Sequence, residues 1–120
     1  MSTLTSILVV LVALEFFYIM YLETIATSSD ATSRVFNMTK DELNRPSVQT
    51  LFKNQGVYNG LIGVGLLYSV FISTASLELG RLLLIYIILV ALYGSITSDK
   101  KIIMTQGGLA ILALISTLFS

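Results

Sequence analysis

Long apolar segments separated by shorter polar ones dominate this chain. A helix that crosses the roughly 30 Å hydrocarbon core of a bilayer needs about 20 mostly apolar residues. Four segments have this character, and they run over residues 4–26, 54–73, 79–97 and 102–119. So many apolar runs leave too few polar residues to cover them in a small soluble domain. The pattern therefore predicts an all-α membrane protein, a single transmembrane domain in which four transmembrane helices form an antiparallel bundle.

The first apolar segment is expected to be a transmembrane helix and not a cleaved signal peptide. A signal peptide begins with basic residues, which are followed by an uninterrupted apolar region. Residues 1–6 contain no Lys or Arg, and Glu15 and Glu23 lie inside or beside the apolar region. Both features argue against cleavage.

The distribution of basic residues predicts the orientation of the bundle. Lys and Arg are enriched in the cytoplasmic loops of membrane proteins. One predicted side, formed by loop 27–53 and the turn 98–101, carries most of them: Arg34, Lys40, Arg45, Lys53, Lys100 and Lys101. The opposite side carries Arg81 alone. Loop 27–53 is therefore expected in the cytoplasm, with both termini outside.

The cytoplasmic loop is expected to contain short helices. Thr39 and Glu42 have the spacing of a capping box, in which two side chains cap a helix reciprocally. Ser47 follows Pro46 and is a candidate N-cap for the helix that leads into the second span. The loop also holds a small apolar cluster, Val35, Phe36 and Met38. We expect this cluster on the membrane surface or on the bundle, and a solvated connector with one short helix is the alternative.

The composition argues against several classes of site. The chain contains no Cys and no His, so disulfides, thiolate metal sites and the usual zinc and haem ligands are missing. Seven basic and seven acidic residues cancel, so no net charge attracts nucleic acid. We therefore expect no metal, no cofactor and no nucleic-acid partner, and we expect the lipid bilayer to surround the helices.

Glu15 is the charged residue that is expected deepest in the membrane. At 1.5 Å per residue, it lies about 18 Å from the cytoplasmic end of its helix, near the bilayer midplane. A carboxylate there is costly and is expected to face the bundle interior. Tyrosines expected within its reach are Tyr18, Tyr68 and Tyr86. Glu15 is predicted either to bind a coupled proton or cation, or to remain a neutral acid that hydrogen-bonds a tyrosine and holds the helices together.

A second polar cluster is predicted near the cytoplasmic face. Glu23 lies about 6 Å inside that face by the same count, and Asn59 reaches its depth if the first two spans are antiparallel neighbours. The other candidates near this level are Asn54, Gln55, Tyr58 and Gln106. Amides both donate and accept hydrogen bonds, which suits a small polar or cationic ligand. The alternative is a set of interfacial side chains that reach water and headgroups.

Three glycines mark one face of the second span. Gly56, Gly60 and Gly63 lie within about 60° of one another on a helix that turns 100° per residue. Small residues on one face allow a second helix to approach closely. We interpret the stripe as a packing face, because it lacks the G-x-G-x-x-G pattern after a strand that marks a nucleotide loop.

Two motifs carry a resemblance to a known family. They are A-L-E-x-x-Y-I-x-Y-L-E over residues 13–23 and N-Q-G-x-Y-N-G over residues 54–60. Together they resemble a family of small bacterial four-helix membrane proteins, the domain of unknown function 1304, over nearly the whole chain. The resemblance implies a multi-pass protein of the bacterial cytoplasmic membrane and brings no established activity. Members of this family often have His where this chain has Phe16, so a carboxylate–imidazole relay beside Glu15 is not implied.

Two classes of function remain open. In the first, the chain is a small transporter or channel that uses Glu15 and the cytoplasm-facing polar cluster. Four helices enclose little volume, so such a protein is expected to form a homo-oligomer. In the second, the chain is a structural or regulatory membrane subunit that transports nothing. An enzyme with Glu23 as a general base is less favoured, because no nucleophile–base pair is visible.

Overall fold

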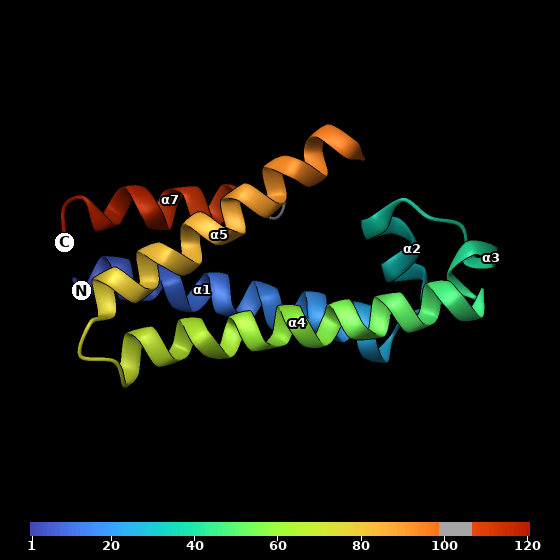
Figure 1. Cartoon of the computed structure of the whole chain (residues 1–120), viewed down its shortest axis with the longest axis horizontal. Coiled ribbons are helices and arrows are strands. Elements are labelled where there is room, and N and C mark those ends of the chain that lie inside the picture. The colour runs from blue at the N-terminus through green and yellow to red at the C-terminus, as the bar shows by residue number, and fades with distance from the viewer. Residues whose placement is uncertain (99–106) are drawn as a thin grey trace. The chain divides into compact units, whose positions relative to one another are not determined.

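A computed structural model describes residues 1–98 and 107–120, and every regular element in these ranges is a helix (Figure 1). The helices are α1 (Thr3–Met20), η1 (Tyr21–Ile25), α2 (Asp30–Phe36), α3 (Lys40–Leu43), α4 (Pro46–Phe71), α5 (Ser76–Thr97) and α7 (Gly108–Thr117). The prediction of an all-α protein is confirmed for the described residues. Gln106 and most of the predicted turn 98–101 lie outside the described residues.

Two helical segments are long and apolar enough to cross a membrane. They are Thr3–Ile25, which combines α1 and η1, and Ser76–Thr97, which is α5. The 26 residues of α4 include amides in its first half that lower its hydropathy, and the described part of the fourth predicted span, α7, has 10 residues. The prediction of four spans therefore receives support for two helices, and the remaining two belong to the proposal below.

The N-termini of α3 and α4 are the two places where the sequence predicts helix N-caps. Thr39 Oγ1 accepts a hydrogen bond from the Glu42 amide at 3.1 Å, and Glu42 Oε1 accepts one from the Thr39 amide at 3.0 Å, which confirms the capping box. The prediction of Ser47 as an N-cap is wrong, because α4 begins one residue earlier, at Pro46. Proline is favoured at the first helical position, where its missing N–H is not needed and its φ angle fits.

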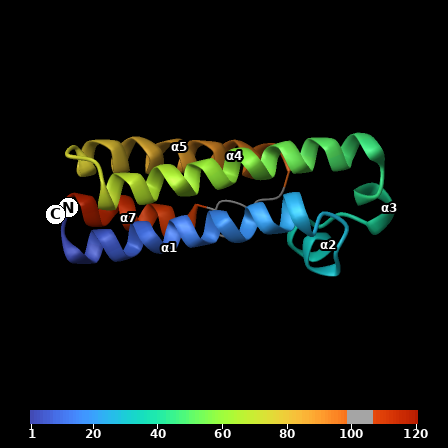
Figure 2. The same cartoon turned by 90° about the horizontal axis from the view of Figure 1, so that it is seen from below.

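The chain forms two compact units, and the first contains Met1–Glu15 and Gly63–Ser120. In this unit α5 lies against α7. The side chains at its core are mostly aliphatic, with Val9, Val12, Leu66, Leu84, Ala110 and Ala113 fully buried. Hydroxyl groups also contribute, since Thr5 and Ser116 hydrogen-bond through their side chains at 2.9 Å in a buried position. The two chain ends meet in this unit, as Figures 1 and 2 both show.

The second unit, Phe16–Ile62, contains η1, α2, α3 and the first part of α4. Here α2 folds back onto η1, and the buried Thr32 hydroxyl donates to the carbonyls of Leu22 at 2.9 Å and Ala26 at 2.7 Å. The ring of Phe36 packs edge-on against Phe52 of α4, with 5.1 Å between the ring centroids. The predicted apolar cluster is therefore divided, because Phe36 packs on α4 while Val35 is exposed.

An ion pair joins α2 to α3 and yields a first prediction. Asp30 Oδ1 lies 2.5 Å from Lys40 Nζ, with both side chains more than half exposed. The hydrogen bond and the charge from Lys40 hold the pKa of Asp30 below its ordinary value of 3.8. A lowered pKa in the folded state stabilises the pair above the ordinary value, and this contribution disappears as the pH falls through the lower one. Lys40→Ala should raise the pKa of Asp30 towards its ordinary value.

Carboxyl chemical shifts of Asp30, followed by NMR during a pH titration, measure this change. Lys53→Ala removes an exposed lysine that forms no ion pair with Asp30 in the described residues, so it serves as the control and should leave the titration unchanged. An Asp30 titration that is identical in Lys40→Ala and in the parent chain would contradict the pairing.

Candidate functional site

The backbone of the second unit contains a π-helical turn, η1, at Tyr21–Ile25. Such turns are rare and occur often at functional sites. The wider turn is closed by the Ala26 amide, which donates to the Tyr21 carbonyl at 2.8 Å. The Thr27 hydroxyl donates to the Glu23 carbonyl at 2.7 Å. These bonds hold the turn in place, and the Glu23 side chain within it is 0% exposed.

The carboxylate of Glu23 accepts hydrogen bonds from two amides of α4. Oε1 accepts from Asn59 Nδ2 at 2.5 Å, and Oε2 accepts from Gln55 Nε2. Gln55 and Asn59 are four residues apart, so one helical turn places both on the same face. Each carboxylate oxygen thus has one amide donor, an arrangement that partly offsets the cost of burying the charge. The structure brings together these three of the residues predicted from the sequence.

Glycines allow α4 to approach η1 closely enough for these hydrogen bonds. A Cβ atom on Gly56 would overlap the Thr24 hydroxyl oxygen and lie 3.1 Å from Glu23 Cβ. A Cβ atom on Gly60 would overlap the Met20 sulfur. The Thr24 hydroxyl in turn donates to the Lys53 carbonyl at 3.1 Å. The contacts at Gly56 and Gly60 agree with the predicted packing face, and Gly63, which is also buried, belongs to the first unit.

Two predicted members of the cluster point elsewhere. Asn54 is exposed, and Tyr58 is 69% exposed. Each is two residues from Gly56, and at 100° per residue this turns them about 160° away from the glycine face. Within the described residues neither hydrogen-bonds Glu23, so the structure does not bring them onto its carboxylate, and their part in binding a ligand stays a prediction.

Glu15 lies in the first unit in a different environment. Its Oε1 atom is buried and has no hydrogen-bond partner among the described residues. The tyrosines expected to pair with it, Tyr18, Tyr68 and Tyr86, are each about half exposed and do not donate to that oxygen. The prediction of a tyrosine partner is therefore wrong for this oxygen. A buried oxygen without a donor is costly, which distinguishes Glu15 from Glu23.

The threonine hydroxyls around η1 were not predicted from the sequence. Thr27 follows Glu23 by four residues, and Ser and Thr side chains often donate to the carbonyl four residues earlier. That spacing was a usable signal. The bond from Thr32 to Leu22 joins two separate elements, so no local pattern indicates it.

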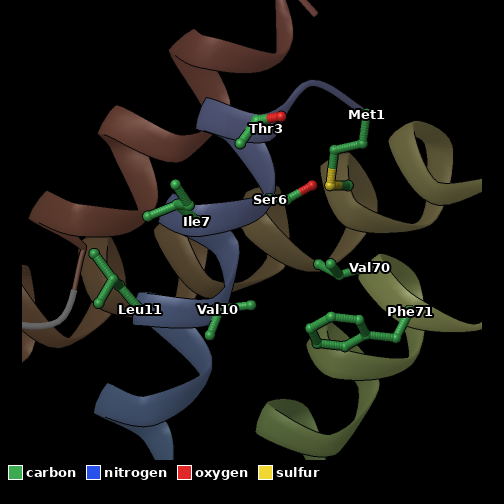
Figure 3. Close-up of a pocket in the computed structure, with 8 residues that line it drawn as sticks. All are labelled: Met1, Thr3, Ser6, Ile7, Val10, Leu11, Val70 and Phe71. Carbon is green, nitrogen blue, oxygen red and sulfur yellow. The ribbon is translucent and has the colours of Figure 1, made fainter.

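The structure also contains shallow grooves in the first unit. One, of about 370 Å³, is drawn in Figure 3. Side chains of α1 and the end of α4 line it, together with Met1: Thr3, Ser6, Ile7, Val10, Leu11, Val70 and Phe71. These side chains offer apolar contacts and two hydroxyls but no ionisable group. Within residues 1–98 and 107–120 no cluster of three or more acidic side chains is present to hold a metal ion.

Comparison with known proteins gives relatives without an assigned activity. A family model described as "Protein of unknown function (DUF1304)" matches residues 10–118. The "Uncharacterized protein YpaA" of Lactococcus lactis subsp. lactis (strain IL1403) is 77% identical over 119 residues, which cover 99% of this chain and 100% of that protein. No solved structure matches the chain. The family resemblance read from the two motifs is thereby confirmed.

Proposed function

Because the chain belongs to the DUF1304 family, whose description names no activity, we propose a function from the geometry of its own residues. The protein is an integral membrane protein with four transmembrane helices, and it moves protons or small cations across the bacterial cytoplasmic membrane. Glu15 is the ion-binding carboxylate within the membrane. Glu23, Gln55 and Asn59 form a polar site near the cytoplasmic face.

Exposed apolar side chains support the location in a membrane. On α5 they form a stripe along one side of the helix: Leu82, Ile85, Tyr86, Leu89, Val90, Leu92, Tyr93 and Ile96 are all exposed. Leu4, Ile7, Leu11 and Leu14 form a similar stripe along α1. Soluble proteins rarely expose contiguous apolar surfaces of this kind, whereas lipid covers them without cost. The basic residues of loop 27–53 support a cytoplasmic location for that loop.

The unpartnered oxygen of Glu15 carries the proposal for transport. An ionisable group within a bilayer must gain a proton, a counter-ion or hydrogen-bond donors. No described residue donates to its Oε1 atom, so a proton or a small cation is the partner that we propose. Four helices enclose little volume, and the proposed path therefore requires a homo-oligomer.

Glu15→Gln tests this proposal. The purified protein is reconstituted into vesicles that contain a pH-sensitive dye, and a potassium diffusion potential drives protons inwards. The variant retains the size and polarity of the side chain but no longer binds a proton, so its flux should fall to that of protein-free vesicles. Glu78→Gln removes an exposed acid at the start of α5 and serves as the control with parental flux. Full flux through Glu15→Gln would refute the role of this carboxylate, and sodium and potassium gradients test the cation alternative.

The hydrogen bonds of Glu23 favour a second candidate, a structural or regulatory membrane subunit. Both carboxylate oxygens already have amide donors from α4, so the group would act as a polar cross-link between two helices. In that case Glu15→Gln would leave the function of the assembly intact, while substitutions at Gly56 would disrupt it. Vesicle flux and subunit association, measured on the same variants, separate the two candidates.

A further inference from the structure

A second groove of the first unit combines one cation with an aliphatic lining. It has a volume of about 450 Å³ and is lined by Arg81, Ile85, Leu114, Ile115, Thr117 and Leu118. These residues come from α5 and from α7 with its C-cap, which lie against each other (Figure 1). Four of the six side chains are aliphatic, and the single charged group is the guanidinium of Arg81.

Arg81 is held in place but retains free donors. Its Nε atom donates to Thr117 Oγ1 at 3.1 Å, and its Nη2 atom donates to the Thr117 carbonyl at 2.7 Å. A guanidinium has five N–H groups in a planar fork, so these two bonds leave three. Within the part of the chain that the structure describes, no carboxylate forms an ion pair with Arg81. A partly buried cation without a counter-ion attracts an anion.

The position of Arg81 in the sequence places it at the depth of lipid phosphates, if the membrane topology proposed above holds. Arg81 lies five residues after the start of α5, which corresponds to about 8 Å along the helix. In that proposed topology it lies on the side opposite loop 27–53. Headgroup regions add several ångströms to each side of the hydrocarbon core, so the guanidinium would lie beside the phosphates of the outer leaflet.

We propose that this groove binds one phospholipid with an anionic headgroup. The guanidinium donates two parallel hydrogen bonds to the phosphate, the geometry in which arginine binds phosphate best. One acyl chain lies against Ile85, Leu114, Ile115 and Leu118. A free phosphate would leave this aliphatic lining uncovered, whereas a lipid covers it and removes apolar surface from water.

Binding is measured on the full chain in a neutral detergent. Phosphatidylglycerol is added, bound lipid is counted by native mass spectrometry, and the lipid-dependent rise in the thermal unfolding midpoint is recorded. We expect one tightly bound phosphatidylglycerol per chain. Arg81→Gln should weaken its binding about tenfold or more, because charge-assisted hydrogen bonds are lost. Ile85→Trp, which fills the groove and retains Arg81, should also weaken it.

Two controls keep the test decisive. Arg34→Gln removes an exposed arginine of the second unit and should leave binding unchanged. If Arg81→Gln does not fold, Ile85→Trp and the comparison of phosphatidylglycerol with phosphatidylcholine on the parent chain still test the site. The proposal is overturned if phosphatidylcholine binds equally well, if inorganic phosphate displaces the lipid, or if Arg81→Gln lowers the midpoint without changing the effect of the lipid.

The result is independent of the flux experiment. Failure of Glu15→Gln to reduce flux would refute the transport role and leave lipid binding intact. Absence of lipid binding would refute the groove as a lipid site and leave transport intact. Flotation of the chain with vesicles reports membrane insertion separately.

Discussion

Gly56→Ala is expected to lower the free energy of unfolding by about 2 kcal/mol, mainly through overpacking at the contact between α4 and η1. The added Cβ would overlap the Thr24 hydroxyl oxygen and press on Glu23 Cβ. Movement of Thr24 would also break its hydrogen bond to the Lys53 carbonyl. Alanine favours a helix over glycine by about 1 kcal/mol. The expected net loss is therefore the overpacking cost at the contact minus this gain in helix propensity.

Two matched substitutions add the same methyl group elsewhere. Gly60→Ala meets the end of the flexible Met20 side chain, which can turn away, so a smaller loss of about 1 kcal/mol or less is expected. Gly108→Ala meets no atom of residues 1–98 or 107–120 within 4 Å, so the change should stay within about 0.5 kcal/mol of zero. Circular dichroism during denaturation in detergent micelles measures all three. The close contact at Gly56 is disproved if the three variants are equally stable.

Asn59→Leu is expected to destabilise the protein by about 3 kcal/mol, because it leaves the Glu23 carboxylate buried with one of its two amide donors removed. Oε1 would lose the bond from Asn59 Nδ2, which measures 2.5 Å. Gln55→Leu should cost less, because Gln55 is exposed and water can replace its amide at Oε2. Both side chains donate one hydrogen bond to the Glu23 carboxylate. The larger loss of stability expected for Asn59→Leu than for Gln55→Leu therefore follows from the greater exposure of Gln55 to solvent.

A double-mutant cycle with Glu23→Leu isolates the interaction. Once the carboxylate is gone, Asn59→Leu removes no charge-assisted hydrogen bond, and its cost should fall by about 1.5–3 kcal/mol. The same denaturation measurement applies to all members of the cycle. An equal cost of Asn59→Leu in both backgrounds would show that the amide does not stabilise this carboxylate.

The two acidic residues of the first apolar segment differ in their surroundings, and this difference decides their proposed roles. Glu23 has donors at both oxygens within its own unit, so it is suited to a fixed position. Glu15 has a buried oxygen without a described donor, so it is suited to exchange a proton or a cation. We therefore expect Glu23 variants to change stability first and Glu15 variants to change flux first.

Local patterns in the sequence were sufficient for several features. The long apolar runs determined the all-helical class, because only helices satisfy the backbone of such segments internally. The spacing of Thr39 and Glu42 determined the capping box, since both partners lie within one helical turn. The spacing of Gln55 and Asn59 placed two amides on one face of α4, and Gly56 beside them indicated a close approach of another helix.

Other features depended on tertiary structure. The π-helical turn at Tyr21–Ile25, which positions Glu23, is held by contacts that include the bond from Thr32 of α2. The exposure of Tyr58, and the lack of a tyrosine donor to Glu15 Oε1 among the described residues, depended on how each helix is rotated about its axis. The physical reason is the range of the interactions. Caps and single-turn spacings involve residues near one another in the chain, whereas rotation, register and the partners of a buried carboxylate are set by packing between elements that are distant in sequence.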